Sequence, residues 1–138
     1  MTRQLFVNLP VADLERSKAF FAGLGFAFDA KFTDEKAACM IVEPDRSYVM
    51  LLSRPFFQGF TKKDICDSAT HVEALMAFSC PTREAVTEMV EKALASGGAA
   101  AMDPQDHGFM FSWSFQDPDG HCWEPLWMDE AAAAAEMG

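Results

Sequence analysis

Cysteines and histidines are the residues in this sequence best suited to chemistry, and their spacing argues against a zinc finger. No two cysteines form a CxxC pair, and no histidine lies at zinc-finger distance from two of them. The three cysteines that lie in apolar runs are predicted to be buried, reduced thiols: Cys39, Cys80 and Cys122. Cys66 lies in a polar stretch and is expected to be exposed. We expect no catalytic cysteine.

Polar residues near predicted strand ends form a second group of candidates. Asp106 and His107 lie in a loop that enters a strand, where polar groups commonly line the rim of a pocket. Asn8 carries both a hydrogen-bond donor and an acceptor, so it could bind a ligand or orient a carboxylate. For each residue, an ordinary role in a turn, a cap or a strand end is the alternative.

The first half of the chain contains the pattern strand, helix and three strands. A strand over 4–9 ends at Pro10, and Asp13 is placed to cap a helix. The apolar face of that helix has helical spacing and consists of Leu14, Ser17, Phe20, Phe21 and Leu24. Three short strands are predicted next, over 26–32, 37–42 and 48–52.

The same order returns in the second half. A strand over 73–80 precedes a helix that Thr82 can cap and that ends near Ser96. Further strands are predicted over 99–102, 109–115 and 122–128. The duplication divides the chain into a first module (about 4–53), an aromatic flap (54–70), a second module (about 71–128) and a tail (129–138).

Charge and hydropathy exclude several classes of partner. The formal net charge of -10 repels a phosphate backbone, so we expect no nucleic-acid partner. No apolar run is long enough to span a membrane, and residues 1–13 do not resemble a signal peptide. We therefore expect a cytoplasmic protein without a membrane partner.

Two segments resemble the vicinal oxygen chelate superfamily, which includes glyoxalases, bleomycin-resistance proteins and extradiol dioxygenases. Residues 8–26 look like its opening segment, and residues 115–124, FQDPDGHCWE, look like its closing one. In detail the chain is similar to the branch of predicted lactoylglutathione lyase-like proteins. The resemblance implies an α+β fold, in which two tandem βαβββ modules form a curled mixed sheet around a cleft. It also implies a homodimer.

The resemblance further implies four metal-ligand positions, one on the first and last strand of each module. Aligning the halves by their caps and turns assigns these positions to Phe6, Met50, Leu75 and Glu124. Hard divalent ions need oxygen or nitrogen donors, and only Glu124 supplies one. We therefore expect no cofactor, and the alternative is a weak Zn²⁺, Ni²⁺ or Mn²⁺ site. A dioxygenase iron site is excluded, because Phe6 and Leu75 stand where its histidines would be.

A carboxylate among apolar side chains is suited to remove a proton next to a carbonyl, so Glu124 is the candidate catalytic base. The alternative is a buried Glu124 whose carboxylate accepts hydrogen bonds from backbone N–H groups or from Asn8.

The many aromatic residues cannot all face helices, so some must line the cleft or a subunit interface. The predicted ligand-binding residues are Phe6, Asn8, Met50, Leu75, Asp106, His107, Phe109 and Trp123.

Two functional hypotheses follow, and the residues do not separate them. The first is a lyase or isomerase that acts on a small carbonyl compound or its thiol adduct, with a degenerate metal site. The alternative is a metal-independent protein of the bleomycin-resistance type that binds a small organic molecule. The acidic net charge and the aromatic residues suit a cationic ligand.

Overall fold

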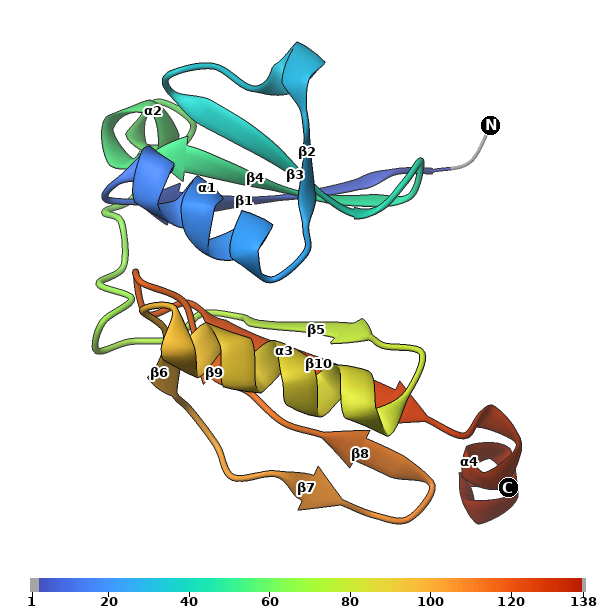
Figure 1. Cartoon of the computed structure of the whole chain (residues 1–138). Coiled ribbons are helices and arrows are strands. Elements are labelled where there is room, and N and C mark those ends of the chain that lie inside the picture. Colours follow the sequence, from blue (N-terminus) through green and yellow to red (C-terminus); the bar gives the residue numbers. More distant parts are fainter. Residues whose placement is uncertain (1–2, 138) are drawn as a thin grey trace. The chain divides into compact units, whose positions relative to one another are not determined.

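A computed structural model describes residues 3–137 and divides into two compact units, one ending at Asp67 and the other beginning at Ser68 (Figure 1). The boundary falls inside the segment predicted as a flap, which begins with a five-residue helix, α2 (Arg54–Gln58).

Unit 1 is a four-stranded mixed sheet with the long helix α1 on one face and the short helix α2 against β1 and β4. Its strands lie in the order β1-β4-β3-β2, and only the β1–β4 pair is parallel. Its elements are β1 (Leu5–Val11), α1 (Leu14–Gly23), β2 (Ala27–Asp29), the 3-10 helix η1 (Ala30–Phe32), β3 (Ala37–Glu43) and β4 (Ser47–Ser53).

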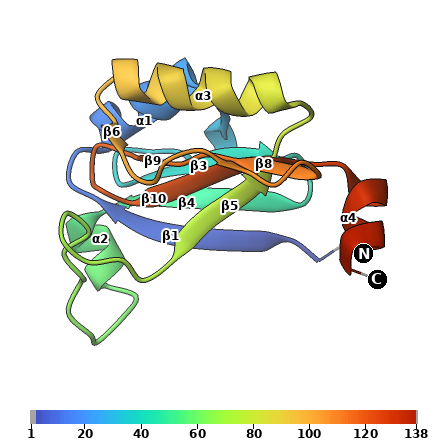
Figure 2. The same ribbon diagram turned by 90° about the horizontal axis from the view of Figure 1, so that it is seen from below.

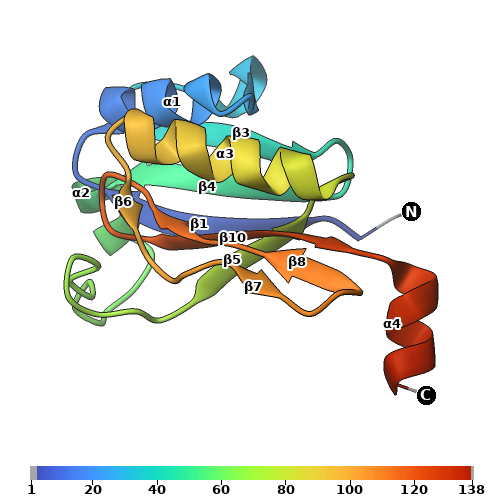
Figure 3. The ribbon, with the colours of Figure 1, turned by 60° about the horizontal axis from the view of Figure 1, so that its bottom comes forward.

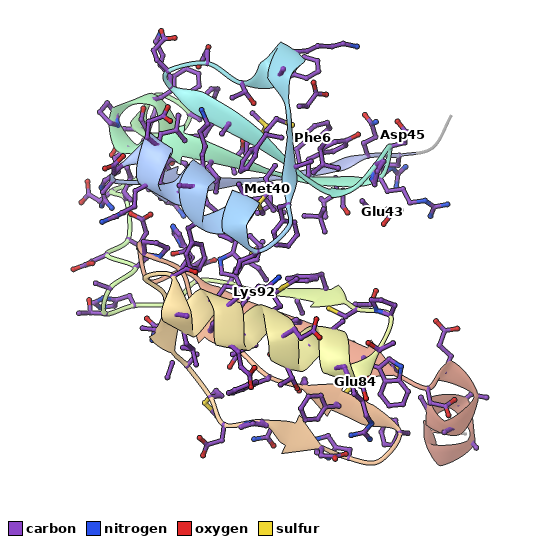
Figure 4. All side chains as sticks on the ribbon, viewed as in Figure 1. Phe6, Met40, Glu43, Asp45, Glu84 and Lys92 are labelled. Atoms are coloured by element: carbon purple, nitrogen blue, oxygen red, sulfur yellow. The ribbon has the colours of Figure 1, made fainter. Side chains whose placement is uncertain are left out.

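Helix α1 forms as the sequence predicts. The Asp13 side chain accepts a hydrogen bond from the Arg16 backbone N–H at 3.1 Å, which caps the helix. The predicted apolar face is buried, with Phe21 fully inaccessible. It packs on the face of the sheet that carries Val49, Leu51 and Met40, and Figure 4 labels Met40 near α1. This layer is the core of unit 1.

Unit 2 repeats this topology. Strand β5 pairs in parallel with β10, and β10 pairs antiparallel with β8 and β9, beyond which lie β7 and β6. The elements are β5 (Leu75–Ser79), α3 (Arg83–Ala95), β6 (Ala99–Ala100), β7 (Gln105–Asp106), β8 (Met110–Ser112), β9 (Phe115–Gln116), β10 (Cys122–Met128) and α4 (Glu130–Met137).

Helix α3 covers one face of the second sheet, on one side of β5, β8, β9 and β10 (Figure 2). Thr82 caps it by accepting from the Ala85 N–H, as predicted. Val86, Val90 and Ala93 are fully buried against the sheet. Helix α4 follows β10 beyond the end of the strands (Figure 3). The α+β fold with a duplicated βαβββ order is therefore confirmed.

Several predicted boundaries are wrong, each for a local reason. Pro10 does not end the first strand, because β1 is an edge strand in which a residue without an N–H is tolerated. The strand predicted over 26–32 is β2 followed by a 3-10 turn that Asp29 caps. The strand predicted over 109–115 is two strands, β8 and β9, and β7 was not predicted.

Candidate functional site

Each sheet has one face covered by its helix and one open face, and strand register decides which side chains lie on each. In unit 1, Asn8 pairs with Met50 and Phe6 with Tyr48. Successive side chains of a strand point to opposite faces, so these four side chains share the face that α1 does not cover. In unit 2, Ala77 pairs with Glu124 and Leu75 with Cys122, in the same arrangement. The predicted alignment of the two halves is confirmed.

The open face of unit 1 is hollowed over β1 and β4. A hollow of about 450 Å³ is lined by Gln4, Phe6, Asn8, Asp29, Phe32, Cys39, Tyr48 and Met50. The rings of Phe6 and Tyr48 stack with centroids 4.9 Å apart and an interplanar angle of 11°. Phe6 remains 47% exposed, so a flat ligand has an aromatic surface to stack on (Figure 4).

A second hollow continues along the same face. It has a volume of about 430 Å³ and shares Asn8, Phe32 and Met50 with the first. Phe56 and Phe60, which contact each other edge to face, line its far side and come from α2 and the turn after it. The aromatic flap therefore contributes to the open face of unit 1. The Asn8 amide has no partner among the described residues of this unit, so its hydrogen-bonding groups are available to a ligand.

The open face of unit 2 holds Glu124. It lies in a hollow of about 540 Å³, lined by Leu75, Ala101, Met102, Asp103, Gln105, Ser112, Trp113, Ser114, Gln116, Cys122 and Glu124. Glu124 is half-buried, and within the described part of unit 2 nothing hydrogen-bonds to its carboxylate. The alternative that backbone N–H groups satisfy Glu124 is therefore not met in this unit. The carboxylate is available to a ligand.

Trp123 does not line this hollow, which corrects one expectation. It is 1% exposed and lies on the helix-covered face, in edge-to-face contact with Phe78. Its indole Nε1–H donates to Asp117 Oδ2 at 3.0 Å. The reason is strand alternation: Trp123 is adjacent to Glu124 in sequence and must point to the opposite face. The same rule places Cys122 on the open face beside Glu124, and Trp113 also lines the hollow, from the irregular segment between β8 and β9; the sequence argument assigned neither residue.

Asp106, His107 and Phe109 lie on and beside the β7–β8 hairpin and line none of the three hollows. The Asp106 carboxylate accepts two hydrogen bonds from Arg83, at 2.9 and 3.1 Å. Those bonds, and one from the Gly108 N–H, hold the pKa of Asp106 down at about 2. This carboxylate is thus already paired with protein groups, and we leave it out of the proposed ligand site.

The cysteines on the open faces are poor nucleophiles. Burial raises the pKa of the Cys39 thiol, and the nearby Asp29 carboxylate raises it further. Burial also raises the pKa of Cys122, with a further contribution from Asp117. A raised pKa leaves little thiolate at neutral pH. Cys66 is exposed, as predicted, and all four cysteines are free.

The donor set does not fit the metal ion that the family resemblance implies. Phe6 and Leu75 offer no lone pair, and the Met50 thioether suits only soft ions. Among residues 3–137, no three His, Cys, Asp or Glu side chains lie close enough together to hold an ion. We therefore derive no step through a metal. No helix in this part of the chain is both long and apolar enough to cross a membrane.

The fold and the open-faced sheets define a glyoxalase-like protein. The chain belongs to the Glyoxalase/Bleomycin resistance protein/Dioxygenase superfamily, whose family model matches residues 3–124. None of the curated proteins compared matches it.

Solved structures with this fold span nearly the whole chain. A hypothetical protein from S. aureus is 26% identical with a TM-score of 0.76, covering 92% of this chain and 94% of its own. The fosfomycin resistance protein FosX from Listeria monocytogenes, solved with Mn(II) and sulfate, is 18% identical with a TM-score of 0.71, covering 100% and 99%. A bleomycin resistance determinant of transposon Tn5 is 18% identical with a TM-score of 0.61, covering 93% and 99%.

Proposed function

We propose that this protein binds a small organic molecule on its open sheet faces without using a metal ion. The observation that carries the proposal is the residue set at the four family ligand positions, Phe6, Met50, Leu75 and Glu124, all of which lie on the sheet faces that α1 and α3 do not cover. Apolar walls with a few unpaired polar groups are typical of small-molecule sites. The likeness to a bleomycin resistance determinant is consistent with this function.

The chemistry of the unit 2 hollow favours an organic cation with an aromatic or apolar part. Glu124 supplies an unpaired carboxylate, and Trp113, Leu75 and Met102 supply apolar surface in the same hollow. A cation gains from the carboxylate and from the face of an indole ring. The net charge of -10 also raises the local concentration of cations.

Glu124→Gln tests this assignment with a matched pair of ligands. Benzyltrimethylammonium and neopentylbenzene have nearly the same shape, and only the first is charged. We expect the substitution to weaken binding of the cation about tenfold, since it removes the Coulomb attraction between the ammonium and the half-buried carboxylate, which is about 1–4 kcal/mol at about 4 Å near a protein surface. Binding of the neutral analogue is expected to change less than twofold. The measurement is the ligand-induced shift in Tm, converted to a Kd, with and without EDTA.

Glu91→Gln is the control, because Glu91 is exposed on α3 and the substitution removes the same charge. Phe6→Ala, with Leu5→Ala as its control on the opposite face of β1, tests the aromatic surface of unit 1 in the same assay. Binding that requires added Zn²⁺, Ni²⁺ or Mn²⁺ and disappears with EDTA would overturn the metal-independent proposal.

A second candidate is a lyase or isomerase reaction on a small carbonyl compound or its thiol adduct. The unpaired Glu124 carboxylate favours it, because a general base needs an oxygen that is free to take a proton. If Glu124 is this base, Glu124→Gln lowers kcat at least 100-fold on the hemithioacetal of methylglyoxal and glutathione. Absence of turnover by the unmodified protein, together with binding of the cation, would leave binding as the function.

We also propose a homodimer, which the family resemblance suggests, and a cytoplasmic location, which the sequence predicts. Sedimentation equilibrium of the purified protein tests the first. A monomer at all concentrations up to 100 µM, on the order of the weakest physiological dimers, would exclude it.

A further inference from the structure

Arg83, the first residue of α3, holds the β7–β8 hairpin with its guanidinium group. Nη1 donates to Asp106 Oδ2 at 2.9 Å, and Nη2 donates to Asp106 Oδ1 at 3.1 Å. Nη2 also donates to the Gly108 carbonyl oxygen at 2.7 Å, in the hairpin turn. A planar guanidinium makes this two-pronged contact with a carboxylate, and an ammonium group does not.

The same guanidinium lies over two aromatic rings on the next strands. Its central carbon is 5.5 Å from the centroid of Phe111 and 4.9 Å from that of Trp127. Asp106 pairs with Phe111, and Phe111 pairs with Trp127, so the three side chains form one row across β7, β8 and β10. Arg83 therefore connects three strands on the helix-covered side of the sheet.

The adjacent row across these strands points to the other face. Gln105 pairs with Ser112, and both side chains line the hollow that holds Glu124. Strand β7 consists of two exposed residues at the edge of the sheet, and β8 is its only strand partner within the described residues. So short an edge strand has little stability of its own, and the Arg83 contacts add to its pairing with β8 in holding it.

We propose that Arg83 is a positioning residue for the ligand-binding hollow of unit 2: it holds β7 in place so that Gln105 and Ser112 form one wall of that hollow. The proposal rests on the function proposed above for the hollow, but the position of the hairpin can be tested without a ligand. The low pKa of Asp106 agrees with this role, because the carboxylate stays charged and paired throughout the neutral range.

Arg83→Lys tests the hairpin contact, because it keeps the positive charge and removes the planar fork. The His107 N–H donates to the Met110 carbonyl oxygen at 2.8 Å and reports on the hairpin. We expect Arg83→Lys to speed hydrogen exchange at this amide about tenfold by NMR, while amides of β3 and β4 in unit 1 keep their rates. Lys92→Ala, an exposed position on the same helix, is the control and is expected to change neither (Figure 4).

Binding distinguishes positioning from a merely structural role. We expect Arg83→Lys to weaken benzyltrimethylammonium binding three- to fivefold with the midpoint of urea unfolding shifted little, and Asp106→Asn to do the same. Faster exchange with unchanged affinity would overturn the positioning role, and so would equal acceleration of exchange at every amide of unit 2. If the unmodified protein binds no benzyltrimethylammonium, the proposed function is at fault for this ligand. The exchange rates then decide on their own whether Arg83 holds the hairpin.

Discussion

Gly120→Ala is expected to lower the free energy of unfolding by about 4 kcal/mol, since two independent costs add. Gly120 has φ +90, a conformation that costs a residue with a Cβ about 1–2 kcal/mol. An added Cβ would also lie 2.9 Å from the Ser68 carbonyl carbon, within rigid backbone. Overpacking of this kind typically costs about 1–3 kcal/mol. Urea denaturation followed by far-UV circular dichroism measures the loss.

Gly97→Ala is the matched control, because Gly97 has φ +104 but nothing lies within 4 Å of an added Cβ. Only the conformational cost applies there, and we expect a loss of about 1–2 kcal/mol. Equal losses at the two glycines would show that the contact with Ser68 does not constrain the turn. That contact includes a hydrogen bond from Ser68 Oγ to the Asp119 carbonyl oxygen at 2.6 Å. The turn matters for the site because β10, which carries Glu124, follows it directly.

Asp117→Ala is expected to lower the free energy of unfolding by about 3 kcal/mol at pH 5. The Asp117 carboxyl is 3% exposed and accepts hydrogen bonds from the backbone N–H groups of Asp119 and His121 and from the Trp123 indole. Removing it takes away the acceptor of one buried donor, the Trp123 indole N–H, and of two part-buried turn amides. A donor left unpaired in the interior costs about 1–3 kcal/mol, and a part-buried one costs less because water reaches it. The substitution also removes the buried carboxylate charge of Asp117, which offsets part of this loss. Asp117→Asn keeps an acceptor for the two turn amides and is expected to lose about 1 kcal/mol.

The stability difference between the unmodified protein and Asp117→Asn is also expected to depend on pH. Burial raises the pKa of Asp117, an effect that outweighs the opposite influences of His121 and of the hydrogen bonds. The folded state therefore binds a proton more tightly than the unfolded state. The unmodified protein therefore has its largest excess in free energy of unfolding over Asp117→Asn below a pH of about 3.9, the pKa of Asp in the unfolded state. This excess decreases as the pH rises through the raised pKa of Asp117 in the folded state. A difference that grows from pH 4 to pH 8 would contradict this.

Much of the fold could be predicted from local signals. The caps Asp13 and Thr82, and the apolar spacing that follows each, locate both main helices, because a cap and a buried stripe depend on residues close in sequence. Strand β10 has the bounds predicted for it. The interruption of the 109–115 strand was not predicted, because Trp113 and Ser114 continue the alternation of apolar and polar residues and nothing local marks the break.

The candidate site was predicted in part. Strand alternation suffices to place Phe6, Asn8 and Met50 on one face, and Leu75 and Glu124 on another. The same rule excludes Trp123, the neighbour of Glu124 in sequence, from the face of Glu124. The prediction that Trp123 binds the ligand overlooked this. Alternation also places Tyr48, two residues before Met50 on β4, on the open face of unit 1, although the sequence argument did not name it. The position of Cys39 needed the pairing of β3 with β4, and that of Phe32 needed the 3-10 turn after β2, neither of which a single sequence specifies.

The sequence by itself determines the duplicated βαβββ order and the residue types at the four family ligand positions, because periodicity, caps and turns are local properties of the chain. Only the tertiary structure decides which groups far apart in the sequence meet, such as Arg83 with Asp106 and Gly120 with Ser68. Those pairs form when the helix and strands of a sheet pack together. Packing therefore decides which carboxylates are paired with other groups of the protein. It leaves the Glu124 carboxylate without a partner in its own unit.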